Sequence, residues 1–376
     1  MIIKNADVFT EEGIFKKREV FIDGDRFAES AGGETIDAYG CYALPGLVDI
    51  HLHGCRNVDF SDGTLDSIRG ITTYEASQGV TTVVPATMTL PEETLMKVSK
   101  AVKEYRENFN PASDEAELFG INMEGPFVSK EKCGAQNPAY LHDPDYEMFS
   151  RLNEASGKAI RLCDIAPELP GAMDFIEKAK KDTVVSIAHT TADYETAREA
   201  IEKGASHVTH LYNAMPGIHH RKPGVIPAAA ENDGVTVELI ADGIHIESSV
   251  IRLTFRLFGR ERIALISDSM MATGLPDGEY ALGGQPVTVK GKLATLHDGT
   301  IAGSATNLMD CMKNAVLSAG IPLYEAVYAA TVTPAKSVGC YDHSGSITPG
   351  KPASLVLLKK GTLETEAVFL RGRRII

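Results

Sequence analysis

The chain lacks both a long apolar run and paired cysteines. No stretch approaches the roughly 20 apolar residues that cross a bilayer, and residues 1–13 lack the basic and apolar regions of a signal peptide. The six cysteines are scattered and form no CxxC pair, which is typical of reduced thiols in the cytosol. We therefore expect a cytoplasmic protein without a membrane span or a disulfide framework.

Positive charge is also scarce, since 37 lysines and arginines face 51 acidic residues and the net charge is -14. This balance argues against nucleic acid or an anionic membrane as the main partner. A phosphorylated small molecule as ligand is still compatible with the acidic net charge, because a pocket can be locally basic. No GxGxxG motif follows an early strand, so a dinucleotide-binding fold has no support.

The 376 residues suit two to three ordinary domains, or one large barrel with an accessory part. Short apolar, β-branched runs recur, and segments with helical periodicity separate most of them. The runs span residues 47–50, 80–85, 118–123, 160–165, 184–188, 207–211, 235–240 and 263–266. Buried strands that alternate with helices predict a parallel α/β sheet, and eight strands favour a (β/α)8 TIM-type barrel over a doubly wound open sheet.

Both ends of the chain have a different character. Residues 2–9 and 14–22 alternate like half-exposed strands, and residues 354–358 and 367–376 do the same. We expect a small β-sandwich domain built from residues 1–46 plus 345–376, and a barrel domain over residues 47–344.

Histidines and carboxylates follow the predicted barrel strands at their carboxyl ends, where barrel active sites lie. His51 and His53 follow the first strand, Glu124 the third, His189 the fifth and His210 the sixth. These side chains suit zinc and related divalent cations. The HxH pair alone would fit two satisfied polar side chains, but five candidate ligands predict two ions bridged by Glu124.

Three further segments carry candidate chemistry. Asp268 ends the eighth strand and suits a general base beside an activated water, with a helix N-cap or a hydrogen-bond acceptor at the mouth of the barrel as the alternative. Arg221 lies in the basic loop 219–222 and suits an anion clamp. Residues 301–304 are expected to open a helix, whose free N–H groups could meet an anion or a sugar oxygen.

The chain resembles the N-acetylglucosamine-6-phosphate deacetylase family of the amidohydrolase superfamily over nearly its whole length. The shared motifs are LPGLVDIHLHG (44–54), MEGPF (123–127), GAQNP (134–138), AHT (188–190), THLYNAMPGIHHRKPG (209–224), ADGIH (241–245), ISD (266–268) and AGS (302–304). The EGPF block and the LYNAMP block with its basic loop are specific to these deacetylases, whereas HxH indicates only the superfamily.

The resemblance implies roles for individual residues. Glu124, His189 and His210 match the ligands of the metal common to the family, and His51 and His53 resemble the HxH of members with a second metal. Asp268 matches the acid/base aspartate. The implied substrate contacts are Ala135, Gln136, Asn213, Ala214, Arg221, His245, Ile301, Ala302 and Gly303.

The resemblance also implies the cofactor and the assembly. One or two divalent ions per subunit are expected, zinc first, with iron, manganese or cobalt as alternatives. Family members often supply the residue matching Arg221 across a dimer interface, so a homodimer is expected. Many members have His where this chain has Gln136; glutamine can donate a hydrogen bond but cannot carry positive charge.

The activity implied is metal-dependent hydrolysis of the acetamide of N-acetyl-D-glucosamine 6-phosphate, giving D-glucosamine 6-phosphate and acetate in amino-sugar catabolism. The galactosamine epimer is an alternative substrate. Many amidohydrolases with two metal ions have a lysine at the end of the fourth strand, and IRLCDIAPE (160–168) has none there. Another amidohydrolase activity is therefore disfavoured. A non-catalytic binding protein would be expected to lose the ligands that this chain retains.

Overall fold

The computed structural model describes residues 1–376, and its centre is a parallel sheet in two pieces. One piece has the order β12-β11-β8 and the other runs from β13 to β18 in sequence order. The strands are β8 (Leu47–Asp49), β11 (Val80–Val83), β12 (Glu117–Leu118), β13 (Ile121–Met123), β14 (Ile160–Ile165), β15 (Val184–Ile187), β16 (His207–Val208), β17 (Thr236–Ile240) and β18 (Ile263–Ile266). They lie within the apolar runs of the sequence except for Glu117 at the start of β12, because a sheet covered on both faces needs apolar residues in succession.

Hydrogen bonds join the two pieces, and the sheet curls. A parallel bridge between Ala86 and Asn122 links the segment after β11 to β13. At the opposite edges, Asp268 N donates to His51 O at 2.9 Å. The ends of β8 and β18 are thereby held together, although these strands belong to different pieces.

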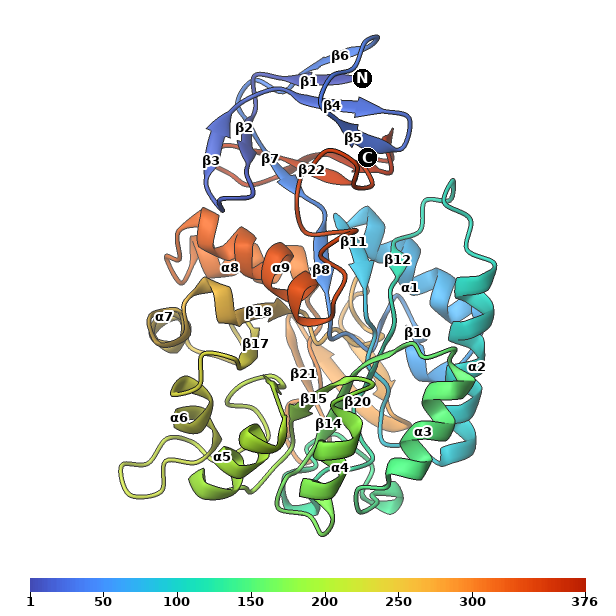
Figure 1. Ribbon diagram of the computed structural model, residues 1–376, viewed down its shortest axis with the longest axis vertical. Coiled ribbons are helices and arrows are strands. Elements are labelled where there is room, and N and C mark those ends of the chain that lie inside the picture. Colours follow the sequence, from blue (N-terminus) through green and yellow to red (C-terminus); the bar gives the residue numbers. More distant parts are fainter.

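Helices cover the outside of the curled sheet (Figure 1). They are α1 (Leu65–Ser77), α2 (Glu92–Glu107), α3 (Tyr146–Ala155), α4 (Ala172–Ala179), α5 (Tyr194–Lys203), α6 (Val225–Ala230), α7 (Ser248–Phe258), α8 (Leu308–Leu317) and α9 (Leu323–Ser337). Short 3-10 turns occur at η1 (Phe60–Asp62), η2 (Lys130–Lys132), η3 (Pro138–Tyr140) and η4 (Arg260–Arg262). Side-chain caps define where several helices begin. Before α1, for example, the side chain of Thr64 accepts a hydrogen bond from Ser67 N, as an N-cap does. No helix has both the length and the apolar character to cross a membrane.

Strands from both ends of the chain pack together beyond α8 and α9, at the top of Figure 1. One sheet has the order β5-β4-β1-β6, from β1 (Ile2–Lys4), β4 (Val20–Asp23), β5 (Arg26–Ala28) and β6 (Thr35–Asp37). The other has the order β24-β23-β22-β7-β2-β3, from β2 (Asp7–Phe9), β3 (Phe15–Lys17), β7 (Cys41–Pro45), β22 (Leu355–Lys359), β23 (Thr365–Leu370) and β24 (Arg373–Arg374). Antiparallel pairing of β7 with β22 brings the two ends into one sheet, and both sheets share an apolar core.

Two antiparallel pieces were not predicted. A hairpin of β9 (Gly54–Cys55) and β10 (Val58–Asp59) follows the HxH segment. A three-stranded sheet of β19 (Gly278–Leu282), β20 (Gln285–Lys290) and β21 (Leu293–Thr295) is inserted between β18 and α8. Its apolar face packs against Met88, Met270 and Ala302, which places it beside the carboxyl end of β18.

The predicted helix start at residues 301–304 is wrong. Ser304 instead forms a parallel bridge with Ser269, and Gly303 has a left-handed φ of 62°. α8 begins only after Asn307, whose side chain accepts from Asp310 N at 2.9 Å. No helix begins directly after Asp268 either, so the N-cap alternative for this residue is also wrong.

Candidate active site

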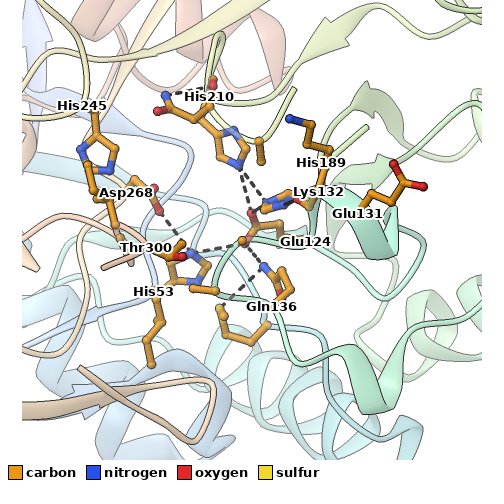
Figure 2. Close-up of a pocket in the computed structure, with 18 residues that line it drawn as sticks. His53, Glu124, Glu131, Lys132, Gln136, His189, His210, His245, Asp268 and Thr300 are labelled. Atoms are coloured by element: carbon orange, nitrogen blue, oxygen red, sulfur yellow. Dashed lines mark hydrogen bonds and ion pairs between the residues drawn. The ribbon is translucent and has the colours of Figure 1, made fainter. Parts of the chain in front are cut away.

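A cavity of about 470 Å³ opens at the carboxyl ends of the parallel strands. Most of the residues singled out from the sequence line it, as Figure 2 shows for those it labels. These are His53, Glu124, Ala135, Gln136, His189, His210, Asn213, Ala214, His245, Asp268, Ile301 and Gly303. His51 lies fully buried beneath the cavity, Ala302 is fully buried beside it, and Arg221 lies outside it.

Glu124, His189 and His210 form a first cluster of ligand atoms, here called the Glu124 group. Glu124 Oε1 lies 2.9 Å from His189 Nε2 and 3.3 Å from His210 Nε2, and the two nitrogens are 3.1 Å apart. His189 Nδ1 donates to Lys132 O at 2.8 Å, which leaves the Nε2 lone pair facing the cavity. Two imidazole nitrogens converging on one carboxylate oxygen suit a divalent cation.

His51, His53 and Asp268 form a second cluster, here called the His51 group. His53 Nε2 lies 3.2 Å from Asp268 Oδ1 and 3.3 Å from Glu124 Oε2. His51 Nε2 lies 3.7 Å from each of the same two oxygens and has no hydrogen-bond partner. An unpartnered buried nitrogen aimed at two carboxylates fits a metal ligand. The two oxygens of Glu124 therefore face different groups.

The backbone at three of these residues adopts left-handed angles, with φ of 42° at His189, 29° at His210 and 49° at Asp268. Such angles cost about 1–3 kcal/mol each in residues other than glycine. Each is the second residue after the end of a strand, where the change of direction lets its side chain line the cavity. The fold thus accepts local strain where the ligand atoms meet.

The surrounding charges keep the buried carboxylates ionised. Burial raises the pKa of Glu124, but the charge of His51 and the hydrogen bonds from His189 and His210 outweigh it, so the pKa lies well below its ordinary value. Burial also raises the pKa of Asp268, and the neighbouring His53 and His51 reverse the shift and lower it. Ionised carboxylates among imidazoles make the cavity floor a favourable place for cations.

His245 lies on the wall of the cavity, beside Asp242. Its Nδ1 donates to Asp242 Oδ2 at 2.8 Å. Burial lowers the pKa of His245, but the hydrogen bond and the charge of Asp242 outweigh it, so the pKa is raised. The imidazolium form, which can bind an anion, therefore persists to higher pH than in an ordinary histidine.

Arg221 is not brought into the cavity of its own chain. It is exposed, its Nη1 lies 2.6 Å from His220 Nε2, and it borders a separate hollow together with Thr191 and Pro216. The neighbouring Ile218 is 53% exposed. Any contact of Arg221 with a ligand in this cavity needs a second copy of the chain or a movement of the loop.

Gln136 is held at both ends of its amide. Its Oε1 accepts from Thr89 N at 2.6 Å, and its Nε2 donates to Glu124 Oε2 at 2.7 Å. The side chain is 3% exposed. In this arrangement both ends of the Gln136 amide are engaged, and the side chain orients Glu124 at the edge of the cavity that it lines.

Several cavity residues were not predicted. Met88, Lys132, Leu282 and Thr300 also line it. Leu282 and Thr300 belong to or flank the inserted sheet, which the strand-end pattern does not reveal. Asp242 had a signal, because Asp and His three residues apart in ADGIH could have suggested the pair.

Comparisons with known proteins agree with this geometry. The sequence model of the Amidohydrolase family matches residues 42–375. The chain is 34% identical to the N-acetylglucosamine-6-phosphate deacetylase of Bacillus subtilis, covering 95% of this chain and 93% of that one. It is 32% identical to the N-acetylgalactosamine-6-phosphate deacetylase of Escherichia coli O157:H7, covering 88% and 86%.

Solved structures give the same result for the fold. A mutant N-acetyl-D-glucosamine-6-phosphate deacetylase from Mycobacterium smegmatis, in complex with N-acetyl-D-glucosamine-6-phosphate, superposes with a TM-score of 0.92 at 32% identity, covering 100% of this chain and 99% of that one. The N-acetylglucosamine-6-phosphate deacetylase from Thermotoga maritima superposes with a TM-score of 0.89 at 27% identity, covering 100% and 99%. The mixed α/β fold with a curled parallel sheet is thus shared with these enzymes, and the chain belongs to the amidohydrolase family.

Proposed function

We propose that this protein hydrolyses the acetamide of N-acetyl-D-glucosamine 6-phosphate to D-glucosamine 6-phosphate and acetate, as a step in amino-sugar catabolism. The observation that carries the proposal is one cavity that brings together two groups of histidine and carboxylate ligands and His245, whose pKa is raised. Deacetylases for this substrate match the chain along almost its entire length.

The two ligand groups are proposed to hold divalent cations. Glu124, His189 and His210 would hold one ion, and His51 and His53 a second, with Glu124 facing both. When bound, such ions polarise a carbonyl oxygen and lower the pKa of a water molecule. We propose zinc, since mixed imidazole and carboxylate ligands suit it; iron, manganese and cobalt are the other outcomes of a metal analysis.

Asp268 is proposed as the proton-transfer residue. Its lowered pKa keeps it ionised at neutral pH, so it can accept a proton from the attacking water. The same oxygen can return that proton to the sugar nitrogen as the C–N bond breaks. Its position, with Oδ1 3.2 Å from His53 Nε2, supports a role beside the ions.

The remaining predicted residues are proposed to hold the sugar phosphate. His245 would bind the phosphate through its imidazolium, which fixes the amide at the other end of the substrate. The proposed contacts along the sugar are Ala135, Gln136, Asn213, Ala214, Ile301, Ala302 and Gly303. Arg221 would reach the phosphate from the partner of a homodimer, and its exposed loop outside its own cavity supports this arrangement.

We also propose the finer fold and location predicted from the sequence. The parallel strands would close into a (β/α)8 barrel over residues 47–344, supported by the bond between His51 O and Asp268 N. Residues 1–46 and 345–376 would form a β-sandwich domain, supported by their shared sheet and core. The six cysteines form no disulfide, which is compatible with the cytoplasm.

The test compares acetate release from three acetamides by zinc-loaded protein. Turnover is expected with N-acetylglucosamine 6-phosphate and far less with unphosphorylated N-acetylglucosamine, which lacks the anion. N-acetylgalactosamine 6-phosphate is the informative third substrate, because a deacetylase named for it matches the chain at similar identity. Preference for that epimer would replace the proposed substrate, and equal rates without phosphate would refute the anion contact.

A further inference from the structure

A buried string of polar side chains connects α9 to the floor of the cavity. It is centred on Glu238 of β17, which is 0% exposed. Glu238 Oε2 lies 2.9 Å from His51 Nδ1. Its Oε1 lies 3.3 Å from Nε2 of His207 on β16, and His207 Nδ1 lies 2.9 Å from Oγ of Ser337, the last residue of α9.

Glu238 does not line the cavity, so contact with a substrate does not explain it. A buried carboxylate is expensive unless donors surround it. Its Oε2 also accepts from His210 N at 3.1 Å, so one oxygen touches a residue from each ligand group. This placement points to a role in holding the ligands.

The contact with His51 determines how that imidazole faces the cavity. A carboxylate oxygen only accepts hydrogen bonds, so His51 Nδ1 must carry the proton. In the neutral ring, the form that binds a cation, the other nitrogen Nε2 then presents its lone pair toward Glu124 and Asp268, 3.7 Å from each. A hydrogen bond on the far nitrogen of a ligand histidine fixes both tautomer and ring orientation.

We propose that Glu238 is a positioning residue that fixes His51 and thereby sets the affinity of the His51 group for its cation. On the side of α9, Ser337 holds His207 by a hydrogen bond, and His207 Nε2 lies close to Glu238 Oε1 without bonding to it. The inference rests on the metal-binding part of the proposed function and is independent of which acetamide is cleaved.

The test is zinc titration of metal-free Glu238→Gln, with the bound zinc measured by elemental analysis at each free zinc concentration. Glutamine keeps the size of the side chain but removes its negative charge, so the hydrogen bond from His51 Nδ1 is no longer charge-assisted and holds the ring less firmly. The dissociation constant of one ion is expected to rise about 10–100-fold, while the other ion binds as in the wild type. A His51→Ala variant identifies which ion belongs to the His51 group.

Glu75→Gln is the matched control. Glu75 on α1 is also a fully buried carboxyl group, both of its oxygens lack hydrogen-bond partners, and it lies outside both ligand groups. Its replacement is expected to leave both zinc affinities unchanged. A matching loss in this control would assign the effect to the loss of any buried acid and overturn the proposal.

Two other results would overturn it: wild-type affinities in Glu238→Gln, or equal weakening of both ions. If Glu238→Gln does not fold, nitrogen NMR of histidine-labelled, metal-free wild-type protein decides. A proton on His51 Nδ1 is expected, and a proton on Nε2 alone would refute the proposal. Zinc titration needs no substrate. The proposal for Glu238 can therefore be supported even if the protein proves to have no deacetylase activity.

Discussion

Two residues that line the cavity have pKa values shifted in opposite directions. The pKa of Asp268 is lowered by its histidine neighbours, and the pKa of His245 is raised by Asp242. At neutral pH the first is a carboxylate that can accept a proton, and the second keeps its proton to higher pH than an ordinary histidine does. Each assignment leads to a separate prediction.

The first prediction concerns proton transfer. In Asp268→Asn the amide cannot accept the proton from water, so kcat is expected to fall by roughly 10²–10⁴. The assay uses saturating zinc and reports bound metal alongside kcat, because Asp268 also belongs to the His51 group. Wild-type kcat in the fully metallated variant would refute the role.

The second prediction concerns pH. The raised pKa of His245 keeps the imidazolium present to higher pH, and this form is lost as the pH rises through that pKa. Asp242→Asn removes the cause of the raised pKa. The KM for the phosphorylated substrate is therefore expected to begin rising at lower pH than in the wild type. KM measured from about pH 5 to 9 tests this, and superimposable profiles would contradict it.

At the scale of elements, the buried strands were predictable and the insertion was not. The parallel strands, β8 and β11 to β18, fall in the predicted apolar runs except for Glu117 at the start of β12, because burial on both faces leaves little choice of residue. The inserted sheet from β19 to β21 is half-exposed and antiparallel, so its sequence carries no comparable run. Its contact with the segment after β18 depends on tertiary packing alone.

The third prediction uses Gly303 to test the packing between the region of the inserted sheet and the segment that follows β18. This residue has a φ of 62°, and an added Cβ would lie 3.2 Å from Asp268 O and 3.3 Å from Met270 Cβ. Gly303→Ala is expected to displace the backbone at Asp268 and reduce kcat/KM by about 10-fold or more.

Gly299→Ala is the control, because Gly299 also has positive φ but meets nothing within 4 Å. It is expected to lower the free energy of unfolding by about 1 kcal/mol and to leave kcat/KM near the wild-type value. Equal losses of activity in the two variants would show that backbone strain alone, and not the contact with Asp268, is responsible.

At the scale of the whole molecule, candidate ligands could be predicted because they follow the strand ends. The clustering of Glu124, His189 and His210 is visible only in three dimensions, as are the contacts of Gln136 and Glu238. Nothing in the local sequence shows that Gln136 donates to Glu124. In the sequence, Glu238 is a single polar residue within a buried strand. Its partners are distant along the chain: they come from β16, from the segment that follows β8 and from the segment that follows β16.

The fourth prediction concerns assembly. If Arg221 serves the partner's cavity, Arg221→Ala and Asp268→Asn are each inactive alone, but their heterodimer contains one intact site. Co-expressed variants that mix at random should recover about a quarter of wild-type activity. Acetate release by the purified mixture measures this. No recovery, or full activity of Arg221→Ala alone, would contradict a shared site.

The measurement that tests the central claim most directly is the release of acetate and free amine from N-acetylglucosamine 6-phosphate by the purified protein. It is made before chelation, after removal of metal, and after zinc is restored. The account predicts equal amounts of both products, loss of turnover on chelation and recovery with zinc. No acetate from the fully zinc-loaded protein, or an undiminished rate in the metal-free protein, would contradict it.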